Sequence, residues 1–268
     1  MCRITYVTFL IAKISLTNHY AGNPGNEQFY AHFGQTILSK ISRIMQISRE
    51  NSLFCTISHL NHVPLPEKYS ELNRVSLVDQ IEYKFNFCIQ YLPKTAKFIL
   101  IGHSIGSYLM LRILPDLLKH KFNVIRCIAL FPTIEHMAES PNGKRLLPWL
   151  KMMLSCLRYL PNSVKERICT FLMGNGCRYF PPCILQSAIE IIDVNVIRNI
   201  IFMAVDELIT VHLFIYLFSD SYLKLTHVYS LNFNLVIIDD KKCEHAFVLN
   251  HGELVANEVV KWITECYD

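Results

Sequence analysis

The chain lacks several patterns that would assign it early to a common class of protein. Its ten cysteines form no C-x-x-C pair, and no N-x-S/T glycosylation sequence occurs. Zinc sites and secreted disulfide frameworks leave recognisable cysteine spacings, so we expect reduced thiols in a cytosolic protein with no metal and no cofactor. No array of basic and aromatic residues favours nucleic acid, and the formal net charge is only +4.

Long uninterrupted apolar segments are missing too, although 51% of the residues are hydrophobic. No stretch of about 18 residues is free of charge or strong polarity, so we predict no membrane-spanning helix. Residues 6–12 are apolar, but Lys13 follows them and no A-x-A site comes after it. We therefore interpret residues 3–16 as a first strand and not as a secretory signal.

The most informative stretch is residues 102–106, which read G-H-S-I-G. An apolar run at 98–101 precedes it, and a segment with helical character at 108–114 follows it. A G-x-S-x-G sequence between a strand and a helix is the nucleophile elbow of an α/β-hydrolase. Its glycines let strand and helix approach closely, and the helix N-terminus favours a developing oxyanion. The pattern indicates Ser104 as a nucleophile; the alternative is an ordinary turn that contains a serine.

Segments with strand and helix character alternate along the first half of the chain. Helical spacing occurs at 29–47 and 76–91, while 53–58 and 124–131 have the composition of buried strands. The helix after residue 106 is expected to be interrupted by Pro115. Alternating strands and helices predict a mostly parallel, doubly wound sheet, the α/β class of fold.

A helical insertion is expected in the second half. The strand signal disappears over residues 138–205, which we predict to be a cap inserted into a hydrolase core formed by 1–137 and 206–268. The core then resumes with three segments: strands at 213–218 and 233–238 and a final helix at 253–265.

One part of the predicted cap is basic and amphipathic. Residues 141–170 contain six basic side chains and one acidic side chain, and an apolar stripe runs beside them. The stripe consists of Leu146, Trp149, Leu150, Met153, Leu154 and Leu157. A helix of this kind lies in a membrane interface, or packs its stripe onto the core as an ordinary cap helix.

Partners for Ser104 are expected after the late strands, because this fold places its acid and then its histidine there. Asp220 follows the predicted strand 213–218 by two residues, and His245 lies between the last predicted strand and the last helix. His245 would take the serine proton, and the carboxylate would orient the imidazole. The alternatives are His227 and His251 for the base, and Asp239 and Asp240 for the acid.

Several of these stretches together resemble the lipid droplet-associated hydrolases. The resemblance runs in order from about Gly22 to Trp262, and its most specific part lies between residues 131 and 143. It is carried by residues 22–25 (GNPG), 56–59 (TISH), 102–106 (GHSIG), 130–135 (LFPTIE), 140–143 (SPNG) and 245–247 (HAF).

The resemblance implies an α/β-hydrolase fold and an esterase activity on sterol esters or related lipids. It also implies peripheral attachment to lipid droplets and to the cytosolic face of the endoplasmic reticulum. Ser104 would be the nucleophile and His245 the base. The oxyanion would be held by the amides of Asn23 and Ile105, since Pro24 has no N–H.

Two stretches depart from the pattern of that family. Residues 16–21 are polar and irregular where an apolar strand is usual, and Asp220 lacks the neighbouring glycine and the W-x-P sequence. A second hypothesis follows: a catalytically weak or inactive protein that keeps the fold, binds lipid droplets and affects lipid storage.

Overall fold

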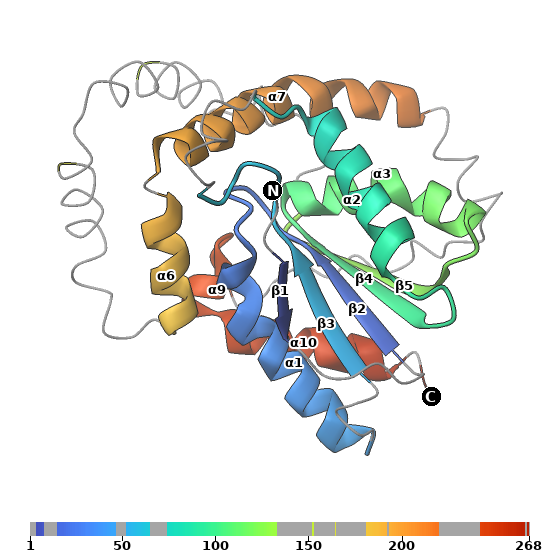
Figure 1. Ribbon diagram of the computed structural model, residues 1–268. Helices are drawn as coiled ribbons and strands as arrows, with labels where there is room; N and C mark the ends of the chain where they lie inside the picture. Colours follow the sequence, from blue (N-terminus) through green and yellow to red (C-terminus); the bar gives the residue numbers. More distant parts are fainter. Residues whose placement is uncertain are drawn as a thin grey trace.

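The computed structural model describes residues 4–7, 15–46, 52–64, 74–132, 152, 164, 181–191, 193–219, 242–265 and 267. In this part of the chain a five-stranded sheet separates two layers of helices (Figure 1). The strands are β1 (Ile4–Val7), β2 (Ser15–Tyr20), β3 (Ser52–Ile57), β4 (Lys97–His103) and β5 (Asn123–Leu130).

The strand order is β1-β3-β2-β4-β5, with β1 antiparallel to β3 and every other pair parallel. The predicted single strand over 3–16 is therefore wrong, because this region contributes two strands. The polar stretch 16–21, expected to be irregular, supplies most of β2 at the centre of the sheet. Pairing with strands on both sides satisfies the backbone of β2, and such tertiary pairing outweighs its weak strand propensity.

Helices cover both faces of the sheet. In Figure 1, α1 and α10 lie on one face and α2 and α3 on the other. The helices are η1 (Glu27–Tyr30, a 3-10 helix), α1 (Ala31–Ile44), α2 (Leu77–Tyr91), α3 (Ile105–Lys119), α6 (Pro182–Ile191), α7 (Val194–Ser219), α9 (Phe247–Asn250) and α10 (Gly252–Thr264).

Side chains of β4 alternate between the two layers, as the two-residue period of a strand requires. Ile99 and Ile101 are buried in the cluster formed with α1 and α10. Phe98 and Leu100 are buried in the cluster formed with α2 and α3. Burial on both faces explains the continuous apolar run in the sequence and confirms the predicted doubly wound, mostly parallel sheet.

Helix α3 is not interrupted at Pro115, contrary to the prediction, and continues to Lys119. A proline inside a helix removes one backbone hydrogen bond and costs about 3 kcal/mol. Ile113, Leu114 and Leu117 are all buried on either side of it. Burial of these three side chains on the sheet offsets that cost.

Helix α7 replaces the strand predicted at 213–218, because it continues to Ser219. Periodicity alone cannot distinguish a short apolar strand from part of a buried helix. The predicted boundary between residues 205 and 206 falls inside this helix, and the predicted strand 233–238 lies outside the described residues. Among the described residues, no helix combines the length and the apolar character needed to cross a membrane.

Candidate active site

Ser104 occupies a strained turn between β4 and α3. Its backbone has φ 52° and ψ −124°, a region that costs a non-glycine residue about 1–3 kcal/mol. Two contacts hold the turn: the Ser104 N–H donates to the carbonyl of Leu130 at 3.0 Å, and Ser107 Oγ donates to the carbonyl of Gly102 at 2.8 Å. The serine side chain is thereby fixed at the carboxyl end of β4, and the residue is only 8% exposed.

The two glycines of the motif are required by close approach of the backbone. A Cβ atom on Gly102 would lie 2.5 Å from Ser107 Cα, and one on Gly106 would lie 2.1 Å from the carbonyl oxygen of Tyr20. Real Cβ contacts essentially never fall below 3.0 Å. Glycine at these positions therefore lets α3 pack directly on β4 and β2, as the sequence predicts.

His245 lies beside Ser104, although the two residues are separated by most of the chain. Its Nε2 atom is 2.9 Å from Ser104 Oγ. The ring also lies 5.2 Å from the ring of His103 and 6.2 Å from that of Phe131. Desolvation lowers the pKa of His245 below its usual value, which favours the neutral imidazole that can accept the serine proton.

The predicted acid, Asp220, lies outside the described residues, as do its alternatives Asp239 and Asp240. Within the described part of the chain, no hydrogen bond from Nδ1 of His245 to a carboxylate is present. The identity of the acid therefore stays a prediction from sequence.

The loop that carries Asn23 runs directly past the serine. A Cβ atom on Gly22 would lie 3.1 Å from Ser104 Cβ, so the backbone there is in near contact with the serine. The Gly22 N–H donates to the hydroxyl of Tyr30 at 3.1 Å and is already engaged. Asn23 directly follows Gly22 and Ile105 is the first residue of α3, and the role of their amides as oxyanion donors stays a prediction from sequence.

Contacts from distant segments hold this loop. Asn23 Nδ2 donates to the carbonyl of Ile200 in α7 at 3.0 Å, and Asn26 Nδ2 donates to Glu190 of α6 at 2.9 Å. From the core side, His62 Nδ1 donates to the carbonyl of Pro24 at 2.8 Å. Burial lowers the pKa of His62 to about 4, so this donor is a neutral ring at pH 7.

A buried charged layer lies beneath the loop. Lys84 is completely buried and donates to the carbonyls of Ile57 and Ser58 at 3.0 and 3.1 Å. The Ser58 hydroxyl donates in turn to the buried carboxylate of Glu27. The sequence does not predict this layer, because lysine and glutamate side chains are usually solvated and nothing in the spacing of Lys84 and Glu27 marks them.

His103 and Tyr30 are also part of the site. From sequence, His103 is expected to point away from the site and to be packed or hydrogen-bonded, and nothing in the sequence marks Tyr30. His103 Nδ1 lies 2.6 Å from the Tyr30 hydroxyl, and its Nε2 lies 2.9 Å from the main-chain oxygen of His245. Both side chains are buried, at 5% and 4% exposure.

Comparison with known proteins assigns this site to a family. Residues 16–248 match the family described as lipid-droplet associated hydrolase. The chain belongs to this family. The match includes every residue of the predicted site.

Individual relatives agree with the family match. A lipid droplet-associated hydrolase from Gallus gallus is 27% identical, over 91% of this chain and 83% of its own. The Drosophila melanogaster relative is 27% identical, over 88% of this chain and 84% of its own. The Homo sapiens relative is 36% identical, over 54% of this chain and 48% of its own.

Solved structures show the fold. A protein assigned provisionally as an epoxide hydrolase from Pseudomonas aeruginosa superposes with a TM-score of 0.60 at 11% identity, over 99% of this chain and 96% of its own. The juvenile hormone epoxide hydrolase of Bombyx mori gives a TM-score of 0.50 at 11% identity, over 98% and 73%. The chain therefore has the α/β-hydrolase fold, as predicted.

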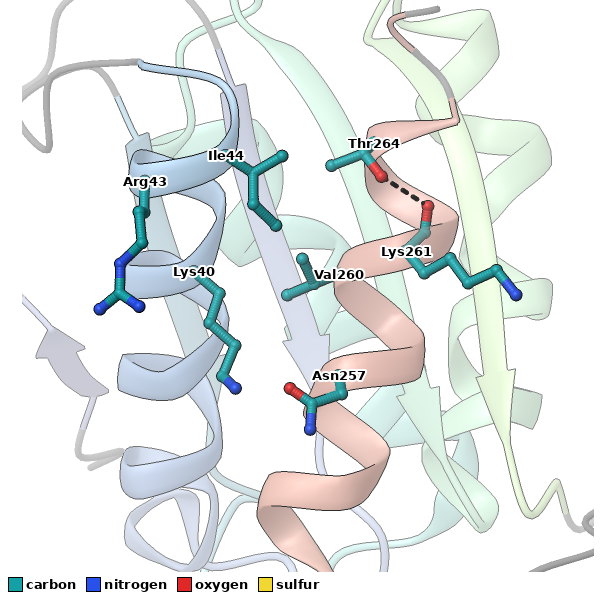
Figure 2. A pocket seen from close by; sticks show the side chains of 7 residues that line it. All are labelled: Lys40, Arg43, Ile44, Asn257, Val260, Lys261 and Thr264. Carbon is teal, nitrogen blue, oxygen red and sulfur yellow. Dashed lines mark hydrogen bonds between the residues drawn. The ribbon is translucent and has the colours of Figure 1, made fainter.

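A groove of about 450 Å³ lies away from these residues, between α1 and α10 (Figure 2). Its basic side chains, Lys40, Arg43 and Lys261, do not converge, and Lys261 extends away from α1 in Figure 2. Lys40 is also paired with Glu253 at 3.7 Å. Cations near helix C-termini stabilise the helices themselves, which accounts for Arg43 and Lys261 without a ligand. Across the described residues, no group of potential metal ligands is close enough to hold an ion.

Proposed function

We propose that this member of the family is a serine esterase that hydrolyses a lipid ester by acyl transfer. The observation that carries the proposal is the 2.9 Å contact between Ser104 Oγ and His245 Nε2 on a strained strand-to-helix turn. A serine and a neutral histidine at this distance form an activated nucleophile.

In the first half of the reaction, His245 Nε2 accepts the Ser104 proton while Oγ attacks the ester carbonyl carbon. The carbonyl π electrons move onto oxygen, and the amides of Asn23 and Ile105 stabilise the oxyanion. Collapse of this intermediate breaks the bond to the alcohol, which leaves with the proton held on His245. An acyl group then remains on Ser104.

In the second half, water takes the place of the alcohol. His245 removes a proton from the water as it attacks the acyl carbon, and it returns that proton to Ser104 Oγ as the bond between Oγ and the acyl carbon breaks and the carboxylic acid product is released. We assign Asp220 to His245 Nδ1, where a carboxylate would fix the tautomer and stabilise the imidazolium. A donor missing from an oxyanion hole costs about 10²–10³ in rate, so both amides matter to turnover.

Sterol esters or related lipid esters at the droplet surface are the proposed substrates. The names of the relatives support the location, and we extend it to the cytosolic face of the endoplasmic reticulum through peripheral attachment. The proposed contact is the basic amphipathic stretch 141–170, almost all of which lies outside the described residues. Each basic side chain near an anionic surface adds about 1 kcal/mol of attraction.

Covalent labelling by a fluorophosphonate tests the chemistry. We expect wild-type protein and a control Ser39→Ala on α1 to be labelled and to hydrolyse a short chromogenic ester. Ser104→Ala should lose both properties at an unchanged melting temperature, because removal of a triad nucleophile costs several orders of magnitude in rate. Equal turnover by Ser104→Ala and wild type would refute the proposal.

The second candidate function is a weak or inactive protein that binds droplets, favoured by the unusual sequence around Asp220. A folded wild type that resists labelling but stays on droplets would select it. Leu150→Glu with Leu154→Glu should release either kind of protein into the cytosol without unfolding it. If the folded double variant stays on droplets, the attachment site lies elsewhere.

A further inference from the structure

Three hydrogen bonds connect the two loops that meet at Ser104. The Gly22 N–H contacts the Tyr30 hydroxyl at 3.1 Å, and that hydroxyl contacts His103 Nδ1 at 2.6 Å. The opposite nitrogen of the same ring, Nε2, contacts the main-chain oxygen of His245 at 2.9 Å. We propose that His103 is a positioning residue for ester hydrolysis, joining the loop of the base to the oxyanion loop through Tyr30. The inference rests on the proposed function.

The direction of every bond in this chain follows from the groups involved. The oxygen of His245 is a carbonyl and can only accept, so His103 Nε2 must carry the hydrogen. A neutral imidazole has one donor nitrogen, so Nδ1 accepts and the Tyr30 hydroxyl donates to it. The lone pairs of that hydroxyl then accept from the Gly22 N–H. One tautomer of His103 satisfies all three contacts.

Burial keeps both side chains in the protonation states that this arrangement needs. Desolvation, with a smaller contribution from His245, lowers the pKa of His103 to about 4, so the ring is neutral at pH 7. Desolvation raises the pKa of Tyr30, so its hydroxyl keeps the proton that it donates. Inside a protein such linked hydrogen bonds are worth more than exposed ones, and breaking one leaves a buried polar group without a partner.

The ring of His103 is itself held in place by aromatic neighbours. It lies 4.9 Å from the ring of Phe247 and 6.3 Å from that of Phe131, both edge-on. His245 lies in a turn just before α9, and its carbonyl accepts the hydrogen bond from His103 Nε2. Because the ring is held rigidly next to Ser104, its hydrogen bond to the His245 carbonyl fixes the distance between the His245 loop and the serine.

Two substitutions test the contacts of the two ring nitrogens separately. In His103→Asn, the side-chain oxygen can take the place of Nδ1 and keep Tyr30, but nothing reaches His245. In His103→Gln, the amide nitrogen can take the place of Nε2 and keep the bond to His245. We expect His103→Asn to lower kcat by about 10²-fold with KM little changed, since a displacement of about 1 Å at a reacting group costs that much.

His103→Gln should recover most of the lost rate, which a purely space-filling role for the ring would not allow. His120→Asn is the matched control: His120 also contacts a main-chain carbonyl, that of Asp116 at 2.9 Å, but lies at the exposed end of α3. It should leave kcat unchanged. If His103→Asn fails to fold, Tyr30→Phe serves instead, because it keeps the ring and removes only the hydroxyl; a lower labelling rate is expected.

The outcomes distinguish the two proposals. Labelling of wild type and folded His103→Asn at the same rate refutes the positioning role and leaves the esterase intact. A wild type that is never labelled refutes the esterase, and the positioning role with it. Ring ¹⁵N chemical shifts give a readout without turnover: we expect the hydrogen of His103 on Nε2, and a hydrogen on Nδ1 would overturn the arrangement.

Discussion

Gly106 offers a sharp test of how the site is assembled. It lies in the first turn of α3, where a Cβ atom would be 2.1 Å from the carbonyl oxygen of Tyr20 and 2.7 Å from that of Ala21. Ordinary van der Waals contact begins at 3.4 Å, so the added methyl group of Gly106→Ala would lie about 1.3 Å too close to the Tyr20 oxygen and about 0.7 Å too close to the Ala21 oxygen. Backbone atoms of a central strand cannot rotate away, and α3 and β2 must separate.

The size of the effect follows from this geometry. Overpacking of a core typically costs 1–3 kcal/mol, and we expect about 2–3 kcal/mol of unfolding free energy here because the clash is with backbone. The strand end that moves leads directly to Asn23, while α3 carries Ile105. The two proposed oxyanion amides are thus pushed apart, and the labelling rate of Ser104 should fall by about 10²-fold.

Urea denaturation and fluorophosphonate labelling measure the two effects on the same preparation. Gly252→Ala is the matched control, since it also adds one methyl group at the start of a helix. A Cβ atom on Gly252 meets its nearest neighbour, the carbonyl of Phe247, at 4.0 Å, so no clash arises. This variant should be as stable and as reactive as wild type. If Gly106→Ala behaves like Gly252→Ala, close packing of α3 on β2 is not what shapes the site.

The remaining predictions concern the acid and the pH dependence of stability. Asp220→Asn should reduce turnover strongly while Asp239→Asn and Asp240→Asn do not; loss of turnover in either of these instead would reassign the acid. Unfolded histidines bind a proton near pH 6.5, whereas His62 and His103 stay neutral in the folded state down to about pH 4. Their stabilisation is complete above pH 6.5 and is lost as the pH falls toward 4, by about 1.4 kcal/mol per pH unit for each. Urea midpoints that stay constant from pH 7 to pH 5 would contradict the burial of these rings.

The serine turn could be predicted because its physics is local. Two glycines at fixed spacing around Ser104, an apolar strand and a helix are all contained in about 20 residues. The steric reason for Gly102 lies within that stretch, at Ser107, whereas Gly106 is required by the backbone of Tyr20 in β2. The order of the fold predicted His245 between the last strand and the last helix; its Nε2 lies 2.9 Å from Ser104 Oγ, and its role as the base stays a prediction.

Predictions failed where tertiary context decides the outcome. The apolar segment 213–218 reads equally well as a buried strand or as part of a long helix, and α7 takes the second form. Polar residues 16–19 gave little strand signal, yet they lie in β2 with partners on both sides. Tyr30 carried no signal at all, because its role depends on a hydrogen bond to a residue 73 positions away.

The hydrogen bonds around residues 22–26 show what such long-range contacts achieve. Asn23 is bonded to α7, Asn26 to α6, and the carbonyl of Gly25 accepts from the His59 N–H at 2.9 Å. The loop that carries the amide proposed for the oxyanion is thus held by α6 and α7 and by the segment that follows β3. A displacement of α7 would move Asn23 as well, because the side chain of Asn23 is hydrogen-bonded to the carbonyl of Ile200 in α7. The position of the loop at residues 22–26 therefore depends on residues in α6 and α7 that lie more than 160 positions along the chain.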